Sequence, residues 1–179
     1  MLYYSKAYEK GGGDMRFSLR PDRLLADYGG VTPELLAQKG VWLLLCDLDF
    51  TLAPKSVKEP PEGVRRWINT MKAAGITVMI LSNNRSSKRV DDFCRTLGID
   101  YVGHAQKPFP KGLRRAMEKA GAQPKESAML GDKLLTDVLA ANLAGVTALM
   151  VEPAGGAQTA WQKVLHAMQR PFKALARER

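Results

Sequence analysis

The chain has 179 residues, of which 45% are apolar and 25% charged, and its 27 lysine and arginine residues against 18 acidic ones give a net charge of +9. This composition is typical of one globular domain and excludes wholesale disorder. The longest apolar run, Val41–Cys46, is far shorter than the ~20 residues that cross a bilayer, which excludes an integral membrane protein. The basic balance favours an anionic partner, namely nucleic acid, anionic lipid or a phosphorylated substrate.

Residues 1–20 are expected to form a flexible lead, because they contain the run Gly11-Gly12-Gly13. They lack the apolar segment of a secretory signal. The two cysteines, Cys46 and Cys94, lie in apolar patterns and are too few for a disulfide framework. We therefore expect a reduced, cytoplasmic protein.

Regular structure is expected from residue 21 to residue 153. Thr32 suits the cap of a helix that begins at Pro33, and Gly40 ends that helix. Val41–Cys46 shows no alternation and predicts a strand buried on both faces. Further strands are predicted at Ile76–Leu81, Ile99–Gly103, Ser127–Leu130 and Val146–Val151, and helices at 64–71, 90–97, 113–120 and Leu134–Ala144. This alternation predicts a three-layer, doubly wound parallel α/β sheet.

The last segment, residues 154–179, predicts a basic amphipathic helix. Its apolar stripe runs from Trp161 to Leu175, and most of its lysines and arginines lie off that stripe. A helix docked on the domain is the first interpretation. A helix that lies on an anionic membrane surface is the second, and it would make the protein peripheral to the membrane.

Polar residues follow four of the five predicted strands at one edge of the sheet, where ligands bind in open α/β folds. Asp47 and Asp49 come directly after the first buried strand, and paired acids there favour a metal ion. Later strands lead to Ser82-Asn83, to Lys107 and to the run Gly131–Asp137. Each signal alone has an ordinary explanation as solvated loop residues. Their joint order, with one strand–helix unit in each gap, predicts a single phosphate-binding site.

These motifs together resemble the haloacid dehalogenase (HAD) superfamily of phosphotransferases over Val41–Val151. The resemblance implies that Asp47 is the nucleophile and Asp49 the general acid/base. It implies a phosphate site and a Mg²⁺ site, with Asp137 in support of the metal or the lysine. The phosphate ligands are expected to be Thr51, Ser82, Asn83 and Lys107, and the metal ligands Asp47, Asp49 through its backbone carbonyl, and Asp132.

A narrower resemblance is to the YqeG-type phosphatases of HAD subclass IIIA, which are similar to phosphatidylglycerophosphate phosphatases. It includes the helix at Thr32–Leu36 and the run Gly131–Asp137. One residue departs from that pattern: Phe50 follows the acid pair where the family usually has Asn or Gly. Those residues tolerate unusual backbone angles that phenylalanine resists, which predicts a change in the geometry of this loop but not in the carboxylates. The gaps on either side of Ser82 are too short for a cap domain, so we expect an open site.

The implied reaction is hydrolysis of a phosphate monoester through an aspartyl-phosphate on Asp47. Mg²⁺ would offset the repulsion between this carboxylate and the anionic substrate, and Asp49 would transfer protons to and from the oxygens. Ser82 and Lys107 would hold the phosphoryl oxygens.

The substrate stays open at this point. The basic surface, the open site and the predicted C-terminal helix favour a phospholipid such as phosphatidylglycerophosphate. A soluble sugar phosphate or nucleotide is an alternative, as is transfer to an acceptor other than water. A different class of function is a basic module that docks on RNA or the ribosome with secondary phosphatase activity. A homo-oligomer is also an open expectation.

Overall fold

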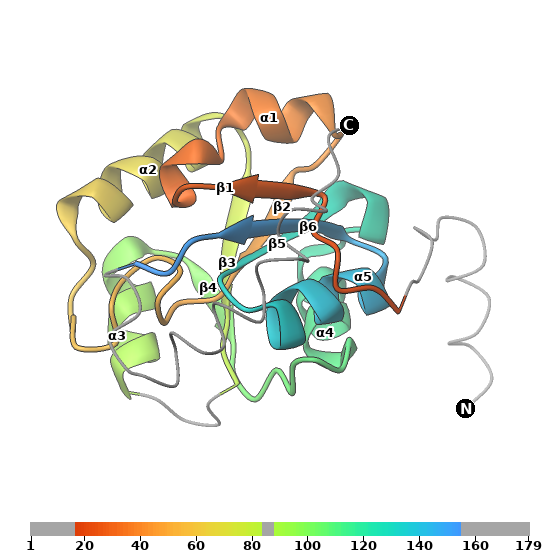
Figure 1. The fold of residues 1–179 in the computed structure, drawn as a ribbon. Coiled ribbons are helices and arrows are strands. Elements are labelled where there is room, and N and C mark those ends of the chain that lie inside the picture. The colour runs from red at the N-terminus through yellow and green to blue at the C-terminus, as the bar shows by residue number, and fades with distance from the viewer. Residues whose placement is uncertain (1–16, 84–87, 155–179) are drawn as a thin grey trace.

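The computed structural model describes residues 17–83 and 88–154, which form a six-stranded, fully parallel sheet in the order β1-β6-β5-β2-β3-β4 (Figure 1). The strands are β1 Arg23–Leu25, β2 Leu43–Cys46, β3 Thr77–Leu81, β4 Asp100–Val102, β5 Ser127–Gly131 and β6 Thr147–Val151. The predicted doubly wound α/β sheet is therefore confirmed.

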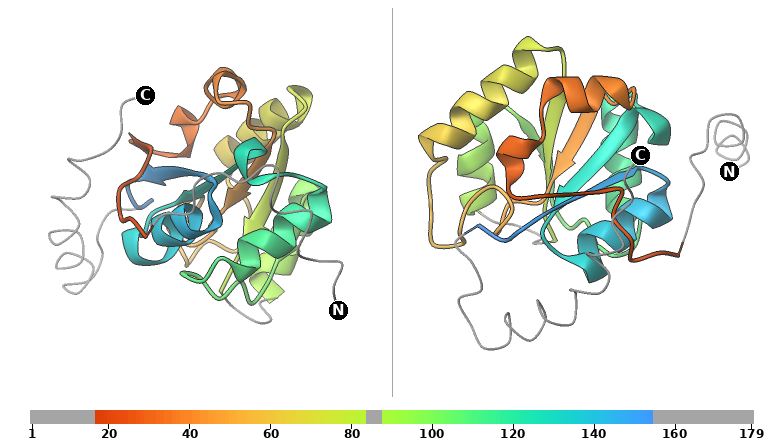
Figure 2. Two further views of the ribbon diagram at one scale, coloured as in Figure 1. Left: turned by 90° about the vertical axis from the view of Figure 1, so that its right-hand side faces the viewer. Right: turned by 45° about the horizontal axis from the view of Figure 1, so that its top comes forward.

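Helices cover both faces of the sheet and make the three expected layers (Figure 2). One core contains side chains from the first three helices, and the other contains side chains from the last two. The helices are α1 Pro33–Gln38, α2 Glu62–Ala73, α3 Lys88–Leu97, α4 Lys111–Ala120 and α5 Leu139–Ala144. All four residues of β2 are buried, because the central strand points alternate side chains into the two cores.

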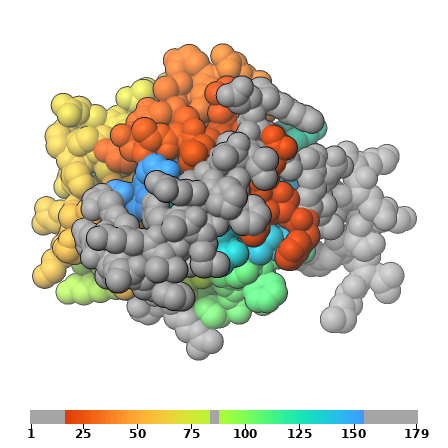
Figure 3. Space-filling model, in the orientation of Figure 1, coloured from red at the N-terminus to blue at the C-terminus, as the bar shows by residue number. Residues whose placement is uncertain are grey.

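The strand β1 is an element that the sequence did not reveal. It pairs with β6 at the edge of the sheet (Figure 1). In the space-filling view a small blue patch, from the last described part of the chain, is visible next to the red segment (Figure 3). Asp22 fixes this pairing, because its N–H donates to the Ala148 carbonyl at 2.8 Å and its carboxylate accepts the Ala148 N–H at 2.8 Å. Three residues are too few to show a hydrophobic period.

The predicted start of α1 is confirmed. The Thr32 hydroxyl accepts the Leu35 N–H at 3.3 Å, and Pro33 is the first helical residue.

The single helix predicted for Leu134–Ala144 was wrong in its first half. Leu134–Val138 form a π-helical turn, and only then does α5 begin. The N–H groups of Asp137 and Val138 both donate to the Lys133 carbonyl, at 2.9 and 3.2 Å. Apolar spacing does not distinguish such a widened turn from an α-helix, and π-turns of this kind occur often at functional sites.

Two other predictions lie outside the described residues. Residues 1–16 include most of the expected flexible lead, and residues 155–179 include nearly all of the expected C-terminal helix. Both stay predictions. Within the described ranges, no helix is both long enough and apolar enough to cross a membrane.

The N-terminal turn of α4 packs unusually closely against the loop that follows β4. A Cβ atom added at Gly112 would lie 2.4 Å from the Ala105 carbonyl oxygen and 2.6 Å from its Cα atom. Both are backbone atoms, which cannot move aside as a side chain can. Glycine at this position therefore lets α4 lie directly beside the loop that leads to Lys107.

We expect Gly112→Ala to lower the free energy of unfolding by about 1–3 kcal/mol, the usual cost of overpacking, although alanine favours helices. Chemical denaturation measures this. The control is Glu118→Ala on the exposed side of the same helix, which should change stability by less than about 0.5 kcal/mol. Equal stability of the two variants would contradict the close backbone approach.

Candidate active site

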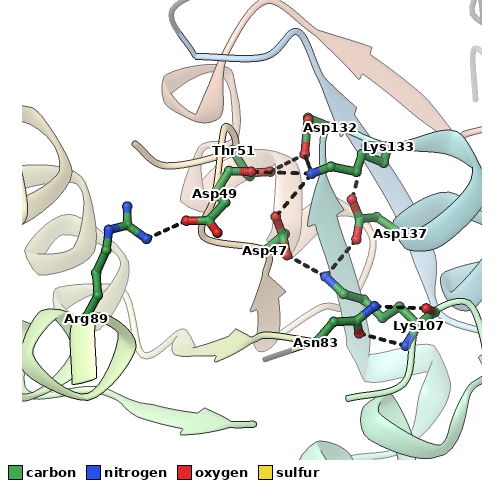
Figure 4. Close-up of polar contacts among 9 residues, drawn as sticks. All are labelled: Asp47, Asp49, Thr51, Asn83, Arg89, Lys107, Asp132, Lys133 and Asp137. Carbon is green, nitrogen blue, oxygen red and sulfur yellow. Dashed lines mark hydrogen bonds and ion pairs between the residues drawn. The ribbon is translucent and has the colours of Figure 1, made fainter. Parts of the chain in front are cut away.

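The topology brings the ends of β2 and β5 together at one edge of the sheet. These strands are neighbours, yet the chain leaves β2 towards β3 on one side and leaves β5 towards β6 on the other. A crevice at such a reversal of strand order is where open α/β sheets bind ligands. Asp47 follows β2 and Asp132 follows β5, so both carboxylates enter this crevice (Figure 4).

Lys107 is the centre of the site. Its ammonium lies 2.6 Å from Asp47 Oδ1 and 2.7 Å from Asp137 Oδ1, and only 2% of its side chain is exposed. Burial alone would lower the pKa of this lysine, but the carboxylates of Asp137 and Asp47 outweigh burial and raise it well above the usual range. Lys107 is therefore a fixed positive charge beside the predicted nucleophile.

The Asn83 side chain holds the backbone of Lys107. Its amide donates to the Lys107 carbonyl at 3.0 Å, and its carbonyl oxygen accepts the Lys107 N–H at 2.8 Å. Ser82, one residue earlier, is buried at the end of β3. The second and third motifs thus meet as expected. Asn83 was predicted to bind phosphate, and in the structure its side chain binds the lysine loop.

Asp132 is the acid of the fourth strand. It is 5% exposed, and its Oδ1 accepts the Thr51 hydroxyl at 3.3 Å and the Lys133 ammonium at 2.7 Å. Burial raises the pKa of this carboxyl to about 6, and Lys133 opposes the rise. Thr51 was predicted to bind phosphate, and in the structure its hydroxyl donates to Asp132. This hydrogen bond holds the loop after β2 against the loop after β5.

Asp137 lies behind Lys107 in the π-turn. Its Oδ2 accepts the Lys133 N–H at 3.1 Å. A Cβ atom at Gly131 would lie 2.3 Å from the Asp137 Cβ, so only glycine leaves room for this carboxylate. Burial raises the pKa of Asp137 against the opposing charge of Lys107. This geometry fits the expected supporting role towards the lysine.

Asp49 faces a different partner. Its carboxylate makes an ion pair with Arg89 of α3, a contact that the sequence did not reveal (Figure 4). Arg89 also donates to the carbonyls of Val57 at 2.7 Å and Pro54 at 3.1 Å. It therefore ties α3 to the whole loop after β2. Arg89 is 40 residues from Asp49 in the sequence, so no local sequence pattern could predict this contact.

Phe50 adopts the left-handed conformation, with φ of 69°. The family pattern has Asn or Gly here, which suggested that phenylalanine would alter the loop. The turn forms nonetheless: the Phe50 N–H donates to the Ala53 carbonyl at 2.9 Å, and Leu52 N–H donates to the Leu48 carbonyl at 3.1 Å. A left-handed conformation at a residue of this type costs about 1–2 kcal/mol, which the surrounding contacts must offset.

Lys133 is the second functional residue that the sequence analysis did not assign. Its ammonium lies 2.7 Å from Asp132 Oδ1, 3.4 Å from the Asp49 carbonyl oxygen and 3.7 Å from Asp47 Oδ2. It also stands 5.9 Å from the centre of the Phe50 ring. Burial would lower its pKa, but Asp47, Asp132 and Asp137 raise it. The only feature of the sequence that could have indicated a role for Lys133 is its position directly after Asp132.

The donor set suits a hard divalent cation. Asp47, Asp132 and Asp137 each offer a carboxylate oxygen, and these oxygens lie within 4.8 Å of one another. Both oxygens of Asp137 have close partners, Oδ1 in Lys107 at 2.7 Å and Oδ2 in the Lys133 N–H at 3.1 Å. Asp47 contacts Lys107 through Oδ1, and its Oδ2 is 3.7 Å from the Lys133 ammonium, so the pair Asp47 and Asp132 is better placed to bind a metal. The Asp49 carbonyl lies beside them, as its contact with Lys133 shows. Oxygen ligands of this kind are those that Mg²⁺ and Ca²⁺ prefer.

We expect Lys107→Met to lower the free energy of unfolding by about 3–5 kcal/mol, because it leaves the Asp47 and Asp137 carboxylates without their shared cation. Denaturant titration at neutral pH measures the loss. The control is Lys119→Met, which removes an ion pair with Asp100 whose two side chains are 49% and 63% exposed and should cost at most about 1 kcal/mol. Similar losses of unfolding free energy in both variants would contradict the stabilising role of the ion pairs that Lys107 makes with Asp47 and Asp137.

Comparison with known proteins identifies the family to which the chain belongs. A model of the family "haloacid dehalogenase-like hydrolase" matches residues 10–145. The chain is 35% identical to the probable phosphatase YqeG of Bacillus subtilis over 133 residues, which is 74% of this chain and 77% of that protein. It is 26% identical to a glyceraldehyde 3-phosphate phosphatase of Pyrococcus furiosus, over 50% of this chain and 40% of that protein.

Solved structures show the same fold. The cobalt-bound deoxy-D-mannose-octulosonate 8-phosphate phosphatase of Haemophilus influenzae superposes with a TM-score of 0.51 at 15% identity, over 76% of this chain and 91% of that one. As expected, no cap domain is present in the described parts of the connections around Ser82, which hold only α2 with β3 and α3 with β4. The chain therefore belongs to the haloacid dehalogenase-like hydrolases and is a phosphatase.

Proposed function

We propose that this phosphatase hydrolyses a phosphate monoester in two steps, with Asp47 as the nucleophile and Mg²⁺ as the cofactor. The observation that carries the proposal is the position of Asp47: its Oδ1 lies 2.6 Å from Lys107, and its Oδ2 faces Asp132 and Lys133 (Figure 4). One carboxylate thus stands where the cations of the site converge. This is where an incoming phosphate dianion is bound best.

In the first step Asp47 attacks phosphorus and becomes an aspartyl-phosphate, while the leaving oxygen departs on the opposite side. Lys107 keeps its charge throughout and stabilises the phosphoryl oxygens. Asp49 gives a proton to the leaving oxygen and takes one from the water that hydrolyses the intermediate. Its carboxylate is a quarter exposed, so it lies within reach of an incoming group.

The proposed metal ligands are the carboxylates of Asp47 and Asp132 and the backbone carbonyl of Asp49. Bound Mg²⁺ would supply positive charge against the developing charge on the phosphoryl oxygens. Thr51 holds the Asp132 carboxylate by its hydrogen bond at 3.3 Å. Phosphate contacts of Thr51, Ser82 and Asn83 belong to the proposal as well.

For the substrate we propose phosphatidylglycerophosphate first. Phe109 and Leu135 are 68% and 52% exposed, and they lie two residues after Lys107 and Lys133 respectively. Exposed apolar side chains in the loops that carry the active-site lysines suit a substrate with an apolar portion. The site also has no cap in the described chain, which leaves room for a large group.

A soluble sugar phosphate is the second candidate, because two of the similar proteins are named as phosphatases of such compounds. Phosphate release from lipid monoesters in mixed micelles, measured beside a panel of sugar phosphates and nucleotides, decides between them. A value of kcat/KM at least tenfold higher for a soluble ester would overturn the lipid assignment. Location in the cytoplasm, contact with a membrane or RNA, and assembly into oligomers stay predictions.

We expect Asp47→Asn to abolish turnover, with a loss of at least about 10³-fold, and to leave the fold intact. Asp49→Asn keeps the shape but cannot transfer a proton. It should lose about 10²–10⁴-fold on an alkyl phosphate and much less on p-nitrophenyl phosphate, whose leaving group needs no proton. Steady-state kinetics and circular dichroism test both variants. Activity of Asp47→Asn within a few-fold of the unaltered enzyme would disprove its role as nucleophile.

We also expect Mg²⁺ to raise the unfolding temperature, because a ligand that binds only the folded state stabilises it, by about 2.7 kcal/mol at a hundred times its Kd. Asp132→Ala should remove this effect. The control, Asp100→Ala, changes an exposed acid that pairs with Lys119 and should keep the full response. An unfolding temperature that does not respond to millimolar Mg²⁺ would count against the metal site.

A further inference from the structure

The Lys133 ammonium lies at the point where three oxygen atoms of the site converge (Figure 4). Asp132 Oδ1 is 2.7 Å away, the Asp49 carbonyl oxygen 3.4 Å and Asp47 Oδ2 3.7 Å. Two are carboxylate oxygens from different strands, and one is a backbone carbonyl. These are the same three residues that the proposed function assigns to Mg²⁺.

A metal ion and an ammonium group cannot both occupy this point. Mg²⁺ binds oxygen at about 2.0–2.1 Å, and a lysine ammonium binds at about 2.7–2.9 Å. The Lys133 ammonium is at hydrogen-bond distance from Asp132 Oδ1 and within 3.7 Å of the other two oxygens, so a metal ion bound by all three oxygens would lie next to it and the two cations would repel each other strongly. Binding of one therefore requires that the other leave.

We propose that Lys133 is an internal competitor of the divalent metal, a statement that rests on the metal site of the proposed function. In metal-free protein the Lys133 ammonium takes the place of the cation. The carboxylates of Asp47, Asp132 and Asp137 carry three negative charges, and Lys107 supplies one positive charge. Lys133 supplies a second, so it reduces the repulsion that would otherwise destabilise the metal-free site.

The position of Lys133 allows it to leave. Its side chain is 43% exposed, whereas that of Lys107 is 2% exposed and lies between two carboxylates. The Phe50 ring stands 5.9 Å from the Lys133 ammonium and offers it a contact outside the acid cluster. Lys133 can therefore move to the surface without disturbing the core, and Lys107 cannot. Of these two cations, only Lys133 is suited to exchange with a metal.

Competition of this kind lowers the affinity for Mg²⁺ below what the oxygen ligands alone would give. Removal of the ammonium should therefore strengthen metal binding, and it should also destabilise the protein when no metal is present. If Lys133 had a purely structural role, its removal would destabilise the metal-free protein but would not strengthen Mg²⁺ binding. The combination distinguishes a competitor from a residue that merely supports the loop.

The test is a Mg²⁺ titration of chelator-treated, dialysed protein, followed by calorimetry and by the unfolding temperature. We compare the unaltered chain with Lys133→Met, which keeps the aliphatic stem, and with the control Lys119→Met at a distant exposed pair. Lys133→Met should unfold at a lower temperature without metal and should bind Mg²⁺ about tenfold more tightly. Lys119→Met should match the unaltered chain. Equal or weaker Mg²⁺ binding by folded Lys133→Met would overturn the inference.

A second measurement does not depend on any variant. An amine-reactive reagent, applied to the unaltered protein and read by mass spectrometry, should label Lys133 more strongly once Mg²⁺ is present, because the amine has moved to the surface. Labelling of Lys133 that stays the same or decreases with Mg²⁺ would also overturn the inference. If neither the unaltered chain nor Lys133→Met binds Mg²⁺, the metal site of the proposed function fails together with it.

Discussion

The buried ion pairs of Lys107 constrain the rest of the site. A charged amine that is almost fully buried is stable only if carboxylates surround it closely, and Asp47 and Asp137 do so at 2.6 and 2.7 Å. This requirement fixes the loops around it. Gly131 leaves space for the Asp137 side chain, the π-turn aims that side chain inward, and Asn83 holds the lysine backbone. Three strand ends are thereby locked to one another through a single ammonium group.

Two aspartates only two residues apart have different electrostatic surroundings. Asp47 lies among the lysines of the crevice, whereas Asp49 pairs with Arg89 at the side of the site. Side chains two residues apart share a face in a regular strand, but β2 ends at Cys46 and the chain from Asp47 is a loop, which lets the Asp49 side chain turn away towards Arg89. The left-handed turn at Phe50 then reverses the chain, and the Asp49 carbonyl faces Lys133. The two side chains therefore have different surroundings, which agrees with the proposal that one is the nucleophile and the other the general acid/base.

The sheet and the assembly of the four motifs were predictable because they depend on local signals. The apolar run that ends at Cys46 identifies the central strand, and the parallel order of strands gathers the polar residues that follow each one. The contacts of Arg89 and Lys133 were not predictable, since they depend on how side chains from distant elements meet. The edge strand at Arg23–Leu25 was too short to detect, and apolar spacing could not reveal the π-turn before α5.

Phe50 shows why a family pattern of residues is weaker evidence than the contacts around a position. Phenylalanine disfavours positive φ by about 1–2 kcal/mol, yet the turn is fixed from both sides. Arg89 binds the loop at Asp49, Pro54 and Val57, and the Ala154 N–H donates to the Phe50 carbonyl at 2.6 Å. The ring in turn lies beside the one exposed lysine among the cations that contact Asp47. Distant contacts thus hold a locally unfavourable residue in place, and its aromatic ring lies beside Lys133, a contact that glycine or asparagine at this position could not make.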